Sequence, residues 1–474
     1  MKNRAIISDI IDNYKNTFIE MSDKIWDYAE IRFKEYKSSK LQQEFFKENG
    51  FKVKSELAGE KTAFIAEYGS GKPIIAFLGE FDALPGISQT ADIAKKEPLV
   101  ENGNGHGCGH NYLGVASVAA SFALAEYMKE KHLEGTIRYY GCPAEENASG
   151  KTYMVRDGLF DECDIAFTWH PGNMNSVVGT GSLANYRVLY HFKGISSHAA
   201  AAPWLGRSAL DAVELMDVGV NYMREHMDSE ARIHYAILDT GGKAANVVQS
   251  DAEVLYAIRA PKLSQAKELR ARVEKIAQGA ALMTGTKVTS TIKAVCSNYI
   301  GNEVIGKVLQ KNLLHYAVKD YSKEEYDYAQ KFKDTLTQLE LDSLRKCLKD
   351  DFGKEEKNIL KKSIVTNIPD YDIKRKFSGS TDVGDVSWVV PTGQFVGNCW
   401  AQGTVAHSWQ ATAQGKSNIG HNGMIAAAKV LAATAREFLE DPKLVKEAKK
   451  SWIELRDGEE YSYPLPEDVN PEIW

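Results

Sequence analysis

Apolar residues in the first part of the chain recur at two spacings, one typical of helices and one typical of strands. Over 6–26 they recur every three or four positions, which predicts a helix with a single apolar stripe. A second helix is predicted over 38–49. The spacing changes at Phe51, and the continuous apolar run at 74–78 predicts a strand covered on both faces.

Strand-like and helix-like segments then alternate as far as residue 169. The predicted strands are 62–67, 136–141 and 164–169, and the predicted helices are 112–130 and 149–157. This alternation predicts an α/β domain in which a parallel or mixed sheet carries helices on both faces.

From about residue 183 the order of elements becomes β-α-β-β-α-β, which is typical of a split-βαβ domain. The predicted strands are 186–192, 233–238, 254–258 and 287–292, and the predicted helices are 207–226 and 263–283. We therefore expect an α+β domain at 183–298, inserted into a larger α/β domain formed by 1–182 and 299–474.

The third part of the chain begins with a charge-dense stretch at 303–376 whose pattern predicts helices. We interpret it as an elaborated solvated surface rather than a partner-binding arm. An Ala-rich helix is predicted at 423–439, before Asp441-Pro442.

Composition narrows the class of protein. The 474 residues include 43% hydrophobic and 26% charged residues, which is typical of a globular protein with a sizeable core. The net charge of −6 argues against nucleic-acid binding, and no apolar run reaches the ~20 residues of a membrane helix. The six cysteines are sparse and irregularly spaced, which favours free thiols and a cytoplasmic enzyme.

Chemically active residues follow three of the predicted buried strands. Glu80 and Asp82 follow the run 74–78, a Glu145-Glu146 pair follows 136–141, and His170 follows 164–169. Ligands of open α/β sheets bind beyond the carboxyl ends of the strands, so these residues predict a site there.

The run Gly105-His106-Gly107-Cys108-Gly109-His110 suggests metal binding. Glycine lets the backbone turn tightly enough to bring Cys108 and His110 to one centre, and thiolate and imidazole both bind zinc-like ions. The alternative is a buried cysteine beside a surface histidine, but the segment is hydrophilic and rich in glycine.

Together with His421, these residues offer more ligands than one catalytic metal ion binds, because a catalytic metal site keeps one coordination position open. A two-metal cluster fits the number better, with the Cys108 thiolate as a possible bridge. Glu145 would then stay unliganded and take a proton from activated water. The predicted metal ligands are Cys108, His110, Glu146, His170 and His421.

The order of these motifs resembles the aminoacylase/carboxypeptidase family of co-catalytic metallopeptidases, in its amidohydrolase branch. The resemblance covers nearly the whole chain. It rests on Asp82-Ala83-Leu84-Pro85, the His-Gly-Cys-Gly-His run at 106–110, Glu145-Glu146, Trp169-His170-Pro171, and Ser197-His198-Ala199-Ala200 with Pro203-Trp204.

The resemblance implies a zinc-peptidase-like catalytic domain interrupted by a lid and dimerisation domain. It implies that the five candidate ligands hold two divalent ions, manganese or zinc, and that Glu145 is the general base. It further implies that His198 stabilises the tetrahedral oxyanion, and that Asn246 and Arg259 hold the substrate's carboxylate.

The activity implied is hydrolysis of the amide bond of an N-acyl amino acid, with an aroyl-glutamate such as p-aminobenzoyl-glutamate as the leading substrate. A homodimer through the lid domain, or a heterodimer with a related subunit, is implied as well. A dipeptidase or an auxin-conjugate-type hydrolase stays open as an alternative, as does a weakly active binding component of a hetero-oligomer.

Two departures from the family pattern bear on the metals. Asn111 stands where many members carry Asp, and Glu80-Phe81-Asp82 stands where they carry an Asp-x-Asp pair. Asn111 cannot act as a carboxylate ligand, so metal affinity and identity are affected more than the reaction class. His106 is a reserve candidate, expected beside the ligands rather than among them.

Overall fold

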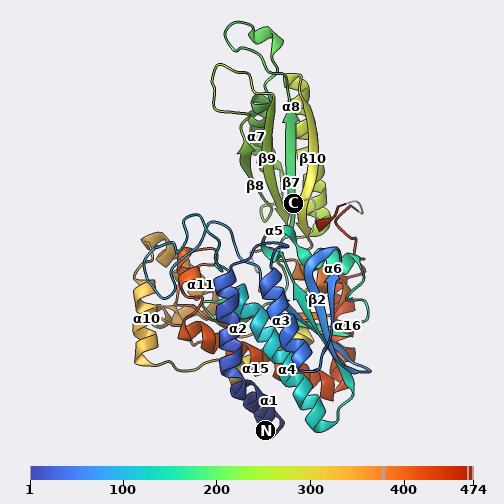
Figure 1. Ribbon diagram of the computed structural model, residues 1–474, viewed down its shortest axis with the longest axis vertical. Coiled ribbons are helices and arrows are strands. Elements are labelled where there is room, and N and C mark those ends of the chain that lie inside the picture. The colour runs from blue at the N-terminus through green and yellow to red at the C-terminus, as the bar shows by residue number, and fades with distance from the viewer. Residues whose placement is uncertain (1, 376–378, 467–468, 472–474) are drawn as a thin grey trace. The chain divides into compact units, whose positions relative to one another are not determined.

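The computed structural model describes residues 2–375, 379–466 and 469–471, which divide into two compact units (Figure 1). As far as its residues are described, unit 1 spans Met1–Thr180, Ile300–Lys376 and Val386–Tyr461. Unit 2 spans Gly181–Tyr299, Phe377–Asp385 and Ser462–Trp474 on the same terms. The segment 183–298, predicted as an inserted domain, lies within unit 2.

Unit 1 is built on a mixed sheet, as the alternation of elements predicted. Within the described residues the strand order is β1-β2-β4-β3-β5-β11-β6. Parallel pairing joins β4, β3, β5 and β11, so the carboxyl ends of β3, β4 and β5 lie at one edge. The strands are β1 Lys52–Leu57, β2 Glu60–Ser70, β3 Ile74–Glu80, β4 Gly135–Cys142, β5 Ile165–Gly172, β6 Ser176–Val177 and β11 Thr392–Asn398.

Helices cover the sheet because its central strands are apolar on both faces. Tyr139 of β4 packs against Phe46 of α3, and the next residue, Tyr140, stacks on Phe160 from the other face. The helices α3 (Tyr36–Glu48), α4 (His110–Lys131) and α15 (Asn418–Glu440) pack against β2, β3 and β5 respectively.

The close approach of α4 to β3 requires a glycine. A Cβ at Gly114 would lie 2.5 Å from the carbonyl oxygen of Glu80. The absence of that atom lets α4, which is buried along most of its length, lie directly on the strand that leads into the site. Among the described residues, no helix has the length and apolarity needed to cross a bilayer.

The predicted helix at 6–26 is two helices, α1 (Lys2–Asn13) and α2 (Lys15–Tyr28). The helix is interrupted at Tyr14, whose backbone leaves the helical region at φ −103° and ψ 9°. Tyr14 packs edge-on against Phe122 of α4, so the apolar stripe continues across the break and its spacing does not reveal it.

The charge-dense stretch is helical, and its helices begin with strong caps. At the start of α10 the side chain of Ser322 accepts from Glu325 N–H, and Thr337 does the same for α11. The elements are α9 Glu303–Tyr316, α10 Lys323–Lys333, α11 Gln338–Phe352, η3 Gly353–Glu355 and α12 Glu356–Ile359. The helix α13, Val383–Val389, begins in unit 2 and ends in unit 1. The remaining helices of unit 1 are α5 Glu145–Ala148, α6 Gly150–Arg156, α14 Trp409–Ala413 and α16 Pro442–Arg456.

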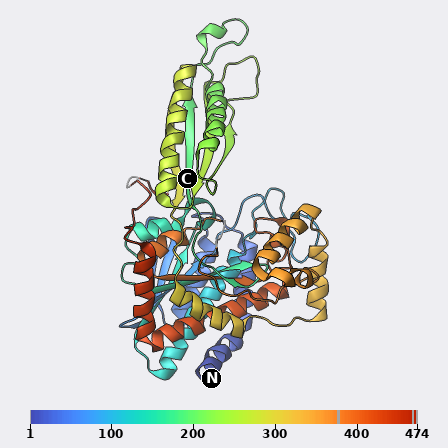
Figure 2. The ribbon, with the colours of Figure 1, turned by 180° about the vertical axis from the view of Figure 1, so that it is seen from behind.

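Unit 2 is an antiparallel sheet with two helices lying along it (Figure 2). Its strand order is β10-β7-β9-β8, and its chain order is the predicted β-α-β-β-α-β. Alternate residues of β9 are buried beneath the helices, which explains the period-two pattern of the sequence. Its elements are β7 Ala184–Lys193, α7 Ala209–Met223, β8 Arg232–Asp239, β9 Asp251–Ala260, α8 Leu263–Thr284 and β10 Lys287–Cys296, with η1 Pro203–Leu205 and η2 Arg224–His226.

Candidate metal and catalytic site

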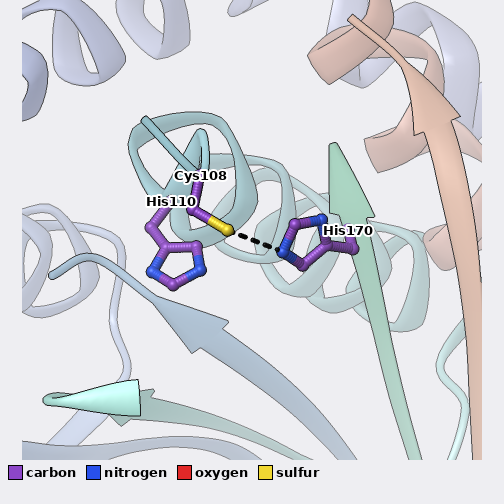
Figure 3. A group of neighbouring side chains, drawn as sticks. All are labelled: Cys108, His110 and His170. Carbon is purple, nitrogen blue, oxygen red and sulfur yellow. Dashed lines mark hydrogen bonds between the residues drawn. The ribbon is translucent and has the colours of Figure 1, made fainter. Parts of the chain in front are cut away.

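Cys108, His110 and His170 come together at the carboxyl edge of the sheet of unit 1, with ligand atoms within 4.8 Å of one another (Figure 3). Cys108 Sγ lies 3.3 Å from His170 Nε2. Between Cys108 and His110, Gly109 adopts φ +74°, a left-handed conformation that side chains disfavour. The glycine pattern of the sequence therefore has the predicted consequence of turning both side chains to one centre.

A second group of metal-capable residues shares the same sulfur. Cys108, Glu146 and His407 also place their ligand atoms within 4.8 Å of one another, with Glu146 Oε2 3.2 Å from His407 Nε2. The backbone N–H of His407 donates to the carbonyl of Gly107 at 2.7 Å, which ties its loop to the cysteine loop. Cys108 thus belongs to both groups.

His421, predicted as a ligand, belongs to none of the metal-capable groups formed by the described residues. It lies in the first turn of α15, and its Nε2 bonds Asp23 Oδ1 of α2 at 2.8 Å. The ring of Tyr112 packs edge-on against it at 6.0 Å between centroids. His407, which was not among the predicted ligands, belongs to the second metal-capable group instead.

Hydrogen bonds to the other ring nitrogen orient two of the histidines. His110 Nδ1 donates to Asp82 Oδ1 at 2.9 Å, and His170 Nδ1 donates to the carbonyl of Pro171 at 2.7 Å. When a ring is neutral, its Nε2 lone pair then faces the cluster. Although burial opposes it, the charges of Cys108 and Asp82 raise the pKa of His110, so its ring is neutral only where a cation takes the place of that proton. His110 Nε2 is buried and makes no hydrogen bond to the described part of the chain, as expected of an atom whose partner is a cation.

The charges around the cluster also fit a divalent cation. Burial and the nearby Glu146 raise the pKa of the Cys108 thiol, so a thiolate here needs a positive neighbour. Although burial opposes it, the hydrogen bond from His407 and the charge of His110 lower the pKa of Glu146 to about 2. Burial lowers the pKa of His170, which keeps its ring neutral and able to ligate. Thiolate, imidazole and carboxylate are the donors of zinc-like ions.

Glu145 and Glu146 belong to different metal-capable groups, and both follow a turn with a left-handed residue. Ala144 has φ +58°, and its N–H donates to Glu35 Oε1 at 3.0 Å. The N–H of Glu146 donates to Asp82 Oδ2 at 3.0 Å. Glu146 is buried in the group with Cys108, whereas Glu145 is half-buried and lies within 4.8 Å of Glu80 and His110.

Three further residues lie near the site, and their places differ in how far the sequence predicted them. Glu35 lies just before α3 and was not predicted as a site residue, because nothing nearby in the sequence marks it as buried. Asn111 is buried and donates to Ser22 Oγ and the Gly415 carbonyl, so it has a structural place rather than a ligand's. His106 bonds the Ile25 carbonyl, and burial lowers its pKa to about 3, in line with a residue beside the ligands.

The remaining predicted site residues lie in unit 2. His198 is exposed, and its Nδ1 accepts the N–H groups of Ala200 and Ala201 at 3.2 and 3.1 Å. These bonds put the proton of the neutral ring on Nε2, where it is available to donate. The carbonyl of Asn246 accepts from the N–H of Ala199 beside it.

Arg259 lies on β9, opposite Asn185 of β7. Burial and the nearby Arg187 lower its pKa. A half-buried guanidinium next to a second one favours an anion as its partner.

Comparisons with known proteins agree with this architecture. The profile of peptidase family M20/M25/M40 matches residues 76–437. A subunit of the p-aminobenzoyl-glutamate hydrolase of Escherichia coli is 41% identical over 470 residues, covering 98% of each chain. The Xaa-Arg dipeptidase of Mus musculus is 27% identical, over 95% of this chain and 92% of its own. A dinuclear metal-binding peptidase of the M20 family from Bacillus subtilis shares the fold, with a TM-score of 0.57 and 15% identity over 90% of this chain and 99% of its own.

Proposed function

The chain belongs to peptidase family M20/M25/M40, and from that premise we propose that it hydrolyses the amide bond of N-acyl amino acids. p-Aminobenzoyl-glutamate is the first candidate substrate, because the E. coli relative, similar over its full length, is named as a subunit of the hydrolase of that compound. The observation that carries the proposal is Cys108, whose sulfur belongs to two groups of metal-capable side chains with Glu145 close by.

Two divalent ions, manganese or zinc, are the proposed cofactors. Cys108, Glu146 and His407 would hold one ion, and Cys108, His110 and His170 would hold the other. Bound ions of this kind supply a water of lowered pKa and polarise the substrate's carbonyl.

Glu145 is the proposed general base. Its half-buried carboxylate lies beside the cluster, whereas that of Glu146 is engaged with Cys108 and His407. In the proposed mechanism Glu145 takes the proton of the attacking water and returns it to the leaving nitrogen. Asp82 and Glu35 hold the turn that keeps the two glutamates apart.

Unit 2 is proposed to bind the substrate and stabilise the transition state. His198 would donate its Nε2 proton to the developing oxyanion, from its own chain or from a partner chain, a contact worth about 3–4 kcal/mol in other enzymes. Asn246 and Arg259 would bind the α-carboxylate, for which a forked guanidinium is well shaped.

A dipeptidase is the second candidate, because the mouse relative that aligns over 95% of this chain is named for an Xaa-Arg dipeptide. The name of the E. coli relative also supports assembly with a related chain, as an alternative to the homodimer expected from the family. A cytoplasmic location, inferred from the free cysteines, stays part of this proposal.

The test is hydrolysis by the purified chain, loaded with manganese or zinc, of p-aminobenzoyl-glutamate, hippurate, indole-acetyl-aspartate and Xaa-Arg dipeptides. We expect the aroyl-glutamate to give the highest kcat/KM. Glu145→Gln should retain the metals and lose about 100-fold or more of the rate. Activity confined to dipeptides would show that the chain is a dipeptidase rather than an aroyl-glutamate hydrolase. A fully active Glu145→Gln would refute the proposed mechanism.

A further inference from the structure

Glu80, the last residue of β3, has a buried carboxylate with two different neighbours. Its Oε1 lies 2.6 Å from Nζ of Lys151, which is itself fully buried. Its Oε2 lies 3.2 Å from Nε2 of His110, a ligand atom of the proposed metal centre. One oxygen is therefore neutralised by an ammonium group, and Glu80 also forms a third metal-capable group with His110 and Glu145.

The contact between Glu80 and His110 requires a proton or a cation between the two atoms. His110 Nδ1 donates to Asp82, so in the neutral ring Nε2 carries a lone pair and no proton. Two buried acceptors facing each other at 3.2 Å, without a hydrogen between them, repel. A shared proton or a shared metal ion resolves this repulsion, and a divalent ion resolves it with the larger charge.

The separation of the two atoms also fits ligands of one ion. Zinc-like ions bind nitrogen and oxygen at about 2.0–2.2 Å, which places neighbouring ligand atoms about 3.0–3.5 Å apart in tetrahedral or octahedral geometry. Glu146 Oε2 and His407 Nε2 lie 3.2 Å apart, and Cys108 Sγ and His170 Nε2 lie 3.3 Å apart. The 3.2 Å between Glu80 Oε2 and His110 Nε2 belongs to the same set of distances.

We propose that Glu80 is a further ligand of the ion held by Cys108, His110 and His170, and that Lys151 positions its carboxylate. This inference rests on the proposed two-metal function. It gives that ion an oxygen donor beside its sulfur and two nitrogens. It also gives a purpose to the glutamate in Glu80-Phe81-Asp82, whose longer side chain reaches both Lys151 and the cluster.

The competing explanation is that Glu80 serves only to neutralise a buried lysine. A buried ammonium without a carboxylate is strongly destabilising, so Glu80→Gln alone would weaken the fold under either explanation. The double variant Glu80→Gln/Lys151→Met separates them, because it removes both charges of the pair and keeps side chains of similar size.

The experiment measures ions per chain and their affinity by chelator competition, alongside thermal melting in excess chelator. Wild type, the double variant and a control, Glu67→Gln/Arg138→Met, are compared. The control removes another ion pair of the same sheet, in which Arg138 Nε lies 2.7 Å from Glu67 Oε2. Neither of its residues belongs to a metal-capable group among the described residues.

We expect the double variant to melt near wild type in chelator, yet to bind one of its two ions at least about 10–100-fold more weakly, the loss typical even of residues behind the ligands. The control should bind both ions as wild type does. Wild-type affinity for both ions in the double variant would overturn the role of Glu80. Failure of the wild type itself to bind two ions would instead overturn the proposed function.

Discussion

At the scale of the residue, the site depends on which histidine nitrogen faces the cluster. His407 and His421 both lie in the last quarter of the chain, and neither has a distinctive local motif. His407 turns its Nε2 toward Glu146 from a loop residue with φ +61°, whereas His421 turns its Nε2 toward Asp23. Of the two, only His407 belongs to a metal-capable group among the described residues.

Substitution of the two histidines should therefore have different effects. His407→Ala should lower the affinity of the chain for one ion by at least about 10–100-fold, because the substitution removes a proposed ligand rather than a supporting group. His421→Ala should retain both ions and cost only the stability of its contact with Asp23. Metal titration with a thermal melt checks both variants, and loss of metal from His421→Ala alone would restore His421 as the ligand.

Glu35, which accepts a hydrogen bond from Ala144 in the turn before Glu145, makes the stability of the fold depend on pH. Burial, with the charge of Asp82, raises its pKa from 4.5 to about 8. The folded state thus binds a proton that the unfolded state releases between these values, so this residue's stabilising contribution is complete below pH 4.5 and is lost as the pH rises through about 8.

We expect Glu35→Gln to flatten that part of the stability profile. The variant keeps an oxygen for the N–H of Ala144 but has no proton to lose. Urea unfolding of the metal-free chain, measured from pH 4.5 to pH 8, compares its slope with that of wild type. A variant whose free energy of unfolding falls with pH as steeply as wild type's would show that Glu35 does not titrate in this range.

At the scale of the element, α10 and the segment after α12 pack against the residues on either side of His407. Phe332 of α10 packs with Trp409 at 6.2 Å between ring centroids, and Gln402 N–H donates to the Ser363 carbonyl at 2.7 Å. Ala401 and Ala413 belong to the same apolar cluster. The stretch predicted as solvated surface thus also supports the loop that carries His407, a proposed metal ligand.

Truncation of this contact should reach the metal site. Phe332 is 1% exposed, so Phe332→Ala should lower the free energy of unfolding by about 3–5 kcal/mol and loosen the ion beside His407. Leu339→Ala on α11, where the side chain is 80% exposed, is the matched control and should change neither. Equal metal affinity in the two variants would show that these helices do not affect metal binding.

Long elements with a clear period were predictable, and short ones were not. The strands β3, β4 and β5 and the inserted β-α-β-β-α-β order follow from continuous or alternating apolar runs. The strand β11, Thr392–Asn398, mixes polar residues and glycines with apolar ones and has no such run, because its neighbours rather than its own side chains define it. The loop of His407 depends on contacts with α10 to α12, distant in sequence, which no local pattern encodes.

At the scale of the whole molecule, unit 2 offers an apolar surface for assembly. On α7 the exposed side chains Leu215, Val218 and Tyr222 recur at helical spacing on one face. The strand β8 ends its sheet, with Tyr235, Ile237 and Leu238 exposed. An edge strand beside an apolar helix face suits a second chain of the same fold, related by a two-fold axis.

We expect the purified chain alone to sediment as a dimer, and Val218→Glu/Tyr222→Glu to sediment as a monomer with an unchanged thermal melt. Analytical ultracentrifugation over a range of concentrations makes this measurement. A wild-type chain that stays monomeric throughout would contradict the homodimer and leave a related chain as the partner.

The shared sulfur of Cys108 is tested most simply by the number of divalent ions that Cys108→Ala retains, determined by elemental analysis after dialysis alongside the wild type. Because this sulfur belongs to both ligand groups, we predict two ions per wild-type chain and weakened binding of both in the variant. A folded variant that keeps one ion at full affinity, or a wild type that binds only one, would contradict a two-metal site bridged by Cys108.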